Sequence, residues 1–145
     1  MNSKIILLVE DNVDDEILTL RALNKNNLAN KIDVVRDGAE ALDYIFCRGE
    51  YSDRDSSDKP QLILLDINLP KIGGMDVLKA IREDDSSKHI PVVMLTTSTQ
   101  ENDMVKSYDY GANSYIGKPV DFNDFMEAVT QVGIYWLAIN STPKD

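Results

Sequence analysis

The chain has 145 residues and a formal net charge of −10, because 25 acidic side chains outnumber 15 basic ones. This length fits one domain, and 43% hydrophobic with 28% charged residues is typical of a globular protein with a buried core. The negative charge repels phosphate backbones and anionic lipid, so it argues against nucleic acid or a membrane as a direct partner. It favours a cation or a basic protein surface instead.

The cysteine and hydropathy patterns indicate a cellular compartment. The single cysteine, Cys47, cannot form an internal disulfide, which is typical of a reducing compartment. No apolar run reaches the roughly 18 residues that a membrane span needs. We therefore expect a cytoplasmic protein.

Apolar runs recur along the chain and predict five strands. Residues 5–9, 62–65 and 92–95 are continuously apolar, which is typical of parallel strands covered on both faces. Weaker strands are expected at 31–36 and 114–116.

Helix-start signals lie between these strands. Asn12 and Asp37 each precede a predicted helix as capping residues, and residues 98–101 form a capping-box sequence for the fourth helix. A third helix should follow the glycine pair at 73–74, and the last should begin near Asp121. The irregular stretch 48–60 is interpreted as a solvated loop that joins the second helix to the third strand.

This alternation predicts an α/β fold with a doubly wound, five-stranded parallel sheet. Right-handed crossovers and five strands favour the flavodoxin-like strand order 2-1-3-4-5. We expect residues 1–145 to form a single domain with a core over 4–137, a short tail over 138–145 and no output domain. Hydrophobic residues 135–137 extend beyond one face of the last helix; a dimer surface and packing against the tail remain equal alternatives.

Three carboxylates follow predicted strands. Glu10 and Asp11 end the first strand and Asp66 ends the third, where the carboxyl ends of neighbouring parallel strands form a ligand crevice. Taken singly, each acid fits a solvated strand end or a helix cap. Together they would repel one another, so the cluster calls for a hard divalent cation, and Mg²⁺ fits best.

Other polar groups are expected at the same crevice. Thr96 ends the fourth strand and Lys118 ends the fifth, while the backbone carbonyl of Asn68 can complete a metal shell. A carboxylate can attack phosphorus while a metal, a lysine and a hydroxyl hold the phosphoryl oxygens. Asp66 is the predicted nucleophile, because Glu10 and Asp11 are adjacent and better suited to hold the metal.

These motifs resemble the receiver domains of two-component response regulators, of the CheY kind. The resemblance covers residues 4–137 and rests on the motifs Leu-Val-Glu-Asp-Asn at 8–12, Leu-Leu-Asp-Ile-Asn-Leu-Pro at 64–70, Pro-Val-Val-Met-Leu-Thr at 91–96 and Tyr-Ile-Gly-Lys-Pro at 115–119.

The resemblance implies a role for each matched residue. Asp66 would receive a phosphoryl group from a sensor histidine kinase, Glu10, Asp11, Asp66 and the Asn68 carbonyl would bind Mg²⁺, and Thr96 and Lys118 would contact the phosphoryl oxygens. Thr96 and Tyr115 would form a switch pair that changes the face built from the fourth helix, the fifth strand and the fifth helix. That face would bind a downstream protein target, and either that face or the C-terminal helix would bind a second copy of the chain.

Finer features are similar to single-domain regulators that partner bacterial phytochromes. They include the long loop after the second helix, Leu-Thr-Thr-Ser at 95–98 and Ile-Tyr-Trp-Leu at 134–137. The resemblance therefore implies a phytochrome as the kinase.

Two other functions fit the sequence less well. An aspartyl phosphatase or mutase would need a second acid two residues after its nucleophile, where this chain has Asn68. A flavin or nucleotide carrier would need a phosphate-binding loop after the first strand, where residues 10–15 are acidic instead. We therefore expect a phosphoacceptor that promotes only its own phosphorylation and dephosphorylation, not an enzyme with external substrates.

Overall fold

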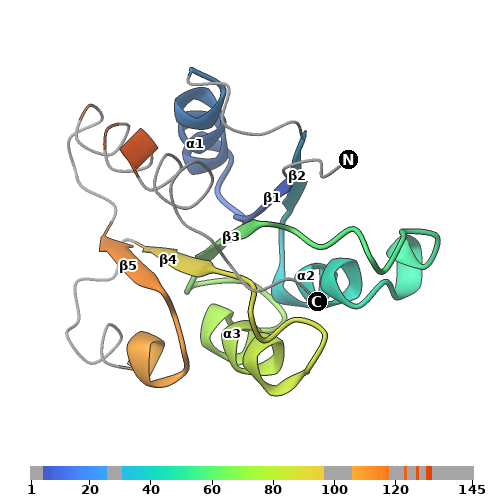
Figure 1. The fold of residues 1–145 in the computed structure, drawn as a ribbon. Coiled ribbons are helices and arrows are strands. Elements are labelled where there is room, and N and C mark those ends of the chain that lie inside the picture. The colour runs from blue at the N-terminus through green and yellow to red at the C-terminus, as the bar shows by residue number, and fades with distance from the viewer. Residues whose placement is uncertain are drawn as a thin grey trace.

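The computed structural model describes residues 5–25, 31–96 and 106–117, together with positions 123, 127, 130 and 131. Five parallel strands form one sheet in the order β2-β1-β3-β4-β5, which confirms the predicted order (Figure 1). Their bounds are β1 Ile5–Val9, β2 Lys31–Val35, β3 Leu62–Asp66, β4 Val92–Thr96 and β5 Ser114–Gly117.

β1 has the predicted bounds, and each of the other four strands ends one residue away from its predicted end. β3, β4 and β5 each extend one residue further than expected, so Asp66 and Thr96 belong to their strands. β2 ends one residue early, at Val35, because the next backbone N–H leaves the ladder: Arg36 donates it to the Glu40 carboxylate at 2.9 Å.

The helices lie on both sides of the sheet. α1 (Val13–Lys25) covers one face, while α2 (Gly38–Ile45) and α3 (Gly74–Glu83) cover the other (Figure 1). The predicted caps form, since Asn12 Oδ1 accepts the Asp15 N–H at 3.0 Å and Asp37 Oδ1 accepts the Glu40 N–H at 2.7 Å.

The starts predicted for the fourth and fifth helices, at 98–101 and near Asp121, lie outside the described residues. Residues 106–109 are helical, as are positions 123, 127, 130 and 131.

Alternation along the strands divides the core into two layers. On β1, Leu7 and Val9 pack with the α2 and α3 side, whereas Ile6 and Leu8 pack with the α1 side. All five β1 side chains are buried. The continuous apolar runs therefore reflect a sheet that is covered on both faces, as the sequence predicts.

The loop at 48–60 is more ordered than its composition suggests. It contains a short 3-10 helix, η1 (Gly49–Tyr51), and two of its side chains turn inward. The Tyr51 hydroxyl donates to Glu40 Oε2 at 2.5 Å, and Arg54 lies over the Tyr44 ring at 4.1 Å while donating to the Tyr44 carbonyl at 2.8 and 3.0 Å. Most of the loop is exposed and it joins α2 to β3, as predicted, while these contacts fix it to α2.

None of the helices in the described part of the chain is long and apolar enough to cross a membrane.

Candidate phosphoacceptor and metal site

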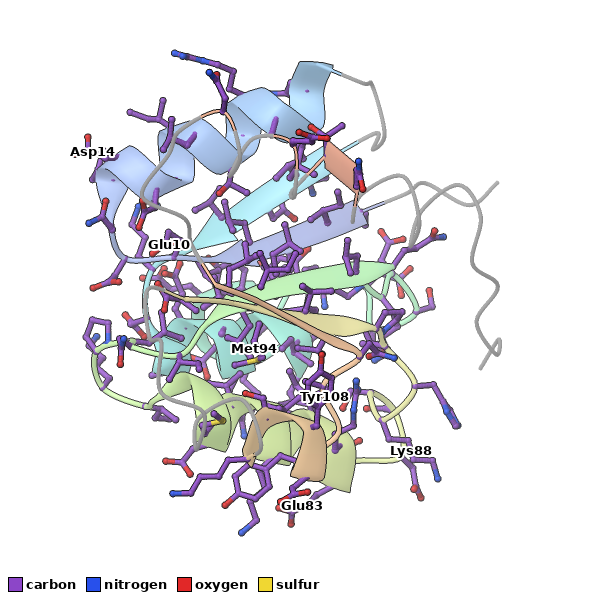
Figure 2. The ribbon with its side chains drawn as sticks, turned by 90° about the vertical axis from the view of Figure 1, so that its left-hand side faces the viewer. Glu10, Asp14, Glu83, Lys88, Met94 and Tyr108 are labelled. Carbon is purple, nitrogen blue, oxygen red and sulfur yellow. The ribbon has the colours of Figure 1, made fainter. Side chains whose placement is uncertain are left out.

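Three carboxylates meet at the carboxyl end of the sheet. β1 and β3 are hydrogen-bonded neighbours, so Glu10 and Asp11, which follow β1, lie beside Asp66, the last residue of β3. One carboxylate oxygen from each residue lies within 4.8 Å of those of the other two. Figure 2 shows Glu10 at one end of the strands, on the same side as Asp14 at the start of α1.

The three acids differ in their exposure. Glu10 is 1% exposed and Asp66 is 7% exposed, whereas Asp11 is open to solvent. The cluster is thus closed on the protein side and accessible at Asp11.

Backbone groups orient the two buried carboxylates. The Asn68 N–H donates to Asp66 Oδ1 at 3.0 Å, and the Asn12 N–H donates to Glu10 Oε2 at 3.3 Å. The Glu10 N–H in turn donates to the Val35 carbonyl at 3.0 Å, which continues the β1–β2 ladder by one residue. The carboxylates are therefore held by the sheet and the loops that follow it.

The loop after β3 carries Asn68 and packs against the start of α2. The Gly38 N–H donates to the Pro70 carbonyl at 3.2 Å, and Lys71 Nζ lies 3.5 Å from Asp37 Oδ2. A Cβ atom on Gly38 would lie 1.8 Å from the Ile72 carbonyl oxygen, so only glycine permits this approach. The contact fixes the backbone of the loop beside the acidic cluster.

The other predicted site residues are described only in part. Thr96 is the last residue of β4 and follows Leu95, which pairs with Asp66 across the sheet. Tyr115 lies in β5 opposite Met94. Lys118, with the Lys118–Pro119 peptide bond, lies outside the described residues, directly after Gly117 at the end of β5.

The donor set fits a hard divalent cation. Three carboxylates this close repel one another, and oxygen ligands of this kind suit Mg²⁺, which retains several of its waters. Asn68, predicted to add its backbone carbonyl to the metal shell, lies in the loop after β3 with its N–H on Asp66 Oδ1.

Comparison with known proteins identifies the family. Residues 6–130 match the model of the response regulator receiver domain. The chain belongs to this family. Phosphorylation by a kinase is the general function of receiver domains, which partner histidine kinases and bind Mg²⁺ or Mn²⁺ at an acidic pocket.

Relatives include several phytochrome response regulators. The chain is 38% identical to the response regulator Rcp1 of Synechocystis sp. over 140 residues, covering 97% of this chain and 93% of Rcp1. It superposes on the phosphorylated cyanobacterial phytochrome response regulator RcpA with a TM-score of 0.90, at 40% identity and covering 97% and 99% of the two chains. The bacteriophytochrome response regulator RtBRR shares 48% identity, with a TM-score of 0.78 and coverage of 97% and 84%.

Sequence reasoning missed part of the geometry around Asp66. It assigned Asn68 a role through its carbonyl, whereas the described contact is made by the Asn68 N–H. Every residue except proline carries such a group, so no side-chain pattern could have revealed it. The same holds for the Asn12 N–H beside Glu10.

Proposed function

We propose that this receiver domain accepts a phosphoryl group on Asp66 from a sensor histidine kinase. The observation that carries the proposal is the placement of Asp66: its carboxylate ends β3 and lies within 4.8 Å of two further carboxylates at the open end of the sheet. In the transfer, an Asp66 oxygen attacks the phosphorus of a phosphohistidine. The new O–P bond replaces the P–N bond, and the imidazole leaves with the electron pair and takes up a proton.

The residues of the cluster are proposed to have two roles, metal binding and orientation of Asp66. Glu10, Asp11 and Asp66, with the Asn68 carbonyl, would hold Mg²⁺, which supplies positive charge against the phosphoryl oxygens. Mn²⁺-bound Rcp1, at 37% identity and a TM-score of 0.89, supports a divalent cation in this family. The Asn68 N–H keeps Asp66 Oδ1 oriented throughout.

Thr96 and Lys118 are proposed to contact the phosphoryl oxygens from the ends of β4 and β5. Thr96 follows the residue that pairs with Asp66, and Lys118 follows Gly117, the partner of Thr96 across the sheet. The proposal is supported by the register, because the carboxyl ends of β4 and β5 lie at the same edge of the sheet as Asp66.

Phosphorylation is proposed to act as a switch through Thr96 and Tyr115. The modification adds roughly −1.5 to −2 charges and new acceptor oxygens at Asp66. A shift from 1:99 to 99:1 between two states needs about 5.5 kcal/mol. A few charge-assisted hydrogen bonds of about 1.5–3 kcal/mol each supply that difference. The changed face, built around β5 and its flanking helices, would bind a downstream protein or a second copy of the chain.

We propose that the protein has no external substrate. Its chemistry would be limited to its own phosphorylation and the hydrolysis of its own acyl phosphate, because Asn68 stands where a general acid would be needed. We propose a cytoplasmic location, which agrees with a lone free thiol at Cys47.

The kinase is proposed to be a phytochrome. RcpA is a phytochrome response regulator, and RtBRR is a bacteriophytochrome response regulator. Phosphotransfer from an autophosphorylated phytochrome kinase should be faster than from an unrelated sensor kinase at equal concentration. Equal rates from both kinases would contradict this partner.

The phosphoacceptor is tested with acetyl phosphate and Mg²⁺, followed by intact mass and peptide mapping. The wild-type protein should gain one phosphoryl group, which Asp66→Asn should abolish. Asp53→Asn is the matched control, because it removes the same charge from an exposed loop position away from the cluster. Label that persists in Asp66→Asn would overturn the assignment.

A further inference from the structure

The guanidinium of Arg82 joins three segments of the fold. Arg82 is half-buried in the last turn of α3, and its three nitrogens donate in different directions. Nε donates to the Gly111 carbonyl at 2.8 Å, Nη1 to the Ile90 carbonyl at 2.7 Å, and Nη2 to Asn113 Oδ1 at 2.9 Å. No carboxylate of the described residues forms an ion pair with it, so the acceptors are neutral groups of the surrounding chain.

These acceptors flank the start of β5. Asn113 immediately precedes β5 and is joined to Val92, the first residue of β4, by two hydrogen bonds. Its side-chain Oδ1 accepts the Val92 N–H at 2.8 Å, and its own N–H donates to the Val92 carbonyl at 2.8 Å. Asn113 Oδ1 therefore accepts both from Arg82 and from the first residue of β4, so one atom connects α3, β4 and β5.

The backbone at Gly111 packs closely against the Arg82 side chain. Gly111 has a φ of +95°, and a Cβ atom there would lie 3.0 Å from the Arg82 side chain. The chain thus passes directly over the guanidinium before it enters β5. Burial lowers the pKa of Arg82 below its usual range, as expected for a cation that is partly removed from water.

β5 is a short strand at the edge of the described sheet. It has four residues, lies at the edge of the sheet and pairs only with β4. Ile116 packs against the buried core on the α1 side, and a slip by one residue would move every side chain of β5 to the opposite face. A slip here would move Tyr115 away from its position opposite Met94.

We propose that Arg82 is a positioning residue that sets the register of β5 against β4. The clamp, defined as Arg82 with Gly111, Ile90 and Asn113, holds the strand at the end opposite to the acidic cluster. Figure 2 shows Lys88, in the turn before Ile90, toward the end of the sheet away from Glu10. A consequence for Tyr115 and the switch rests on the proposed function; the clamp itself does not.

The clamp needs the shape of arginine as well as its charge. Lysine carries three donors on one nitrogen and cannot reach three acceptors around a planar fork. Arg82→Lys therefore keeps the charge and loses the clamp. Asn113→Asp keeps the shared acceptor and gives it a negative charge, which should strengthen the contact with Arg82.

Amide hydrogen exchange of the unphosphorylated full chain tests the clamp. In Arg82→Lys, exchange over residues 114–117 should accelerate by about tenfold or more, the effect of losing a hydrogen bond to a charged group. The amides of β1 and β3 should remain as protected as in the wild type. Asn113→Asp should slow exchange at 114–117, and Lys79→Met, which removes an exposed cation from the same helix, should leave it unchanged.

Two results would overturn the proposal. One is an equal increase of exchange in β1, β3 and β5, which would mean that Arg82 only stabilises the whole domain. The other is unchanged exchange at 114–117 in Arg82→Lys together with no gain of protection in Asn113→Asp.

Phosphoryl uptake from acetyl phosphate separates this proposal from the proposed function. Uptake by Arg82→Lys should match the wild type, because the clamp lies at the far end of the sheet from Asp66. Loss of uptake in Arg82→Lys alone would count against a local clamp. Failure of the wild-type protein to take up a phosphoryl group would reject the proposed function, while hydrogen exchange would still decide the role of Arg82.

Discussion

Neutralising Asp66 should stabilise the protein when divalent cations are absent. In a metal-free solution, the carboxylates of Glu10, Asp11 and Asp66 repel one another, and the sheet prevents them from moving apart. Asp66→Asn removes one charge and keeps the side-chain oxygen that accepts the Asn68 N–H. The variant therefore loses repulsion without losing its described hydrogen bond.

The separation of the oxygens sets the scale of the effect. At the 4.8 Å limit, two unit charges repel by about 3.5 kcal/mol at an effective dielectric constant of 20 and by about 0.9 kcal/mol in water. The larger value is the guide for the pair of Asp66 with buried Glu10, and the smaller one for the pair with exposed Asp11. Allowing for relaxation, we expect Asp66→Asn to raise the free energy of unfolding by about 2 kcal/mol in EDTA.

The assay is urea unfolding in EDTA and again with Mg²⁺. Wild-type protein should gain stability with Mg²⁺, by about 2.7 kcal/mol at a concentration 100 times the dissociation constant. Asp66→Asn should gain much less stability from Mg²⁺. Its advantage over the wild type in free energy of unfolding should therefore shrink or reverse. Asp53→Asn should behave as the wild type does in both solutions. Equal or lower stability of Asp66→Asn in EDTA would refute the reasoning, because the Asp66 charge would then not be repelled, on balance, by its surroundings.

Two further substitutions test contacts outside the cluster. Burial and the neighbouring Glu40 carboxylate raise the pKa of Tyr51 to about 12. Its protonated phenol therefore stabilises the fold below pH ~10, and this contribution is lost as the pH rises through about 12. Tyr51→Phe should therefore show a smaller loss of stability over that range than the wild type, and equal losses in alkaline urea titrations would contradict the assignment. Gly38→Ala should destabilise the fold by about 2 kcal/mol or more and weaken Mg²⁺ binding, because its Cβ would clash with the Ile72 carbonyl. Gly73→Ala, whose Cβ would meet nothing closer than 4.0 Å, is the control, and equal urea midpoints for the two variants would exclude a special role for Gly38.

The fold was predictable because its strands are buried on both faces. Continuous apolar residues such as those at 5–9 and 62–65 cannot belong to a half-solvated sheet, and short crossovers leave few possible strand orders. The same reasoning predicted that Glu10 and Asp66 are neighbours, because it placed their strands side by side. Topology alone, without any side-chain detail, predicted that the acids would be neighbours.

The order of the loop at 48–60 could not be predicted in this way. Three aspartates in the loop indicate solvated chain, and the anchoring residues Tyr51 and Arg54 look like further surface residues. Their partners, Glu40 and Tyr44, lie on α2, 11 and 10 residues away in sequence. Neither the helical nor the strand period predicts a contact at these separations. Contacts of this kind depend on the folded position of both segments, as do the Arg82 clamp and the contact of Gly38 with Ile72.

The acidic cluster also depends on the folded chain and not on local sequence. Nothing in the local sequence favours three carboxylates within 4.8 Å, and their repulsion opposes the fold in the absence of a cation. They are held there by the β1–β3 ladder and the buried side chains on both of its faces, whose packing stabilises the domain by more than the repulsion costs. The unfavourable energy of the cluster is electrostatic. Binding a dication or modifying Asp66 therefore changes the energy of this edge of the sheet by several kcal/mol, with little movement of the core.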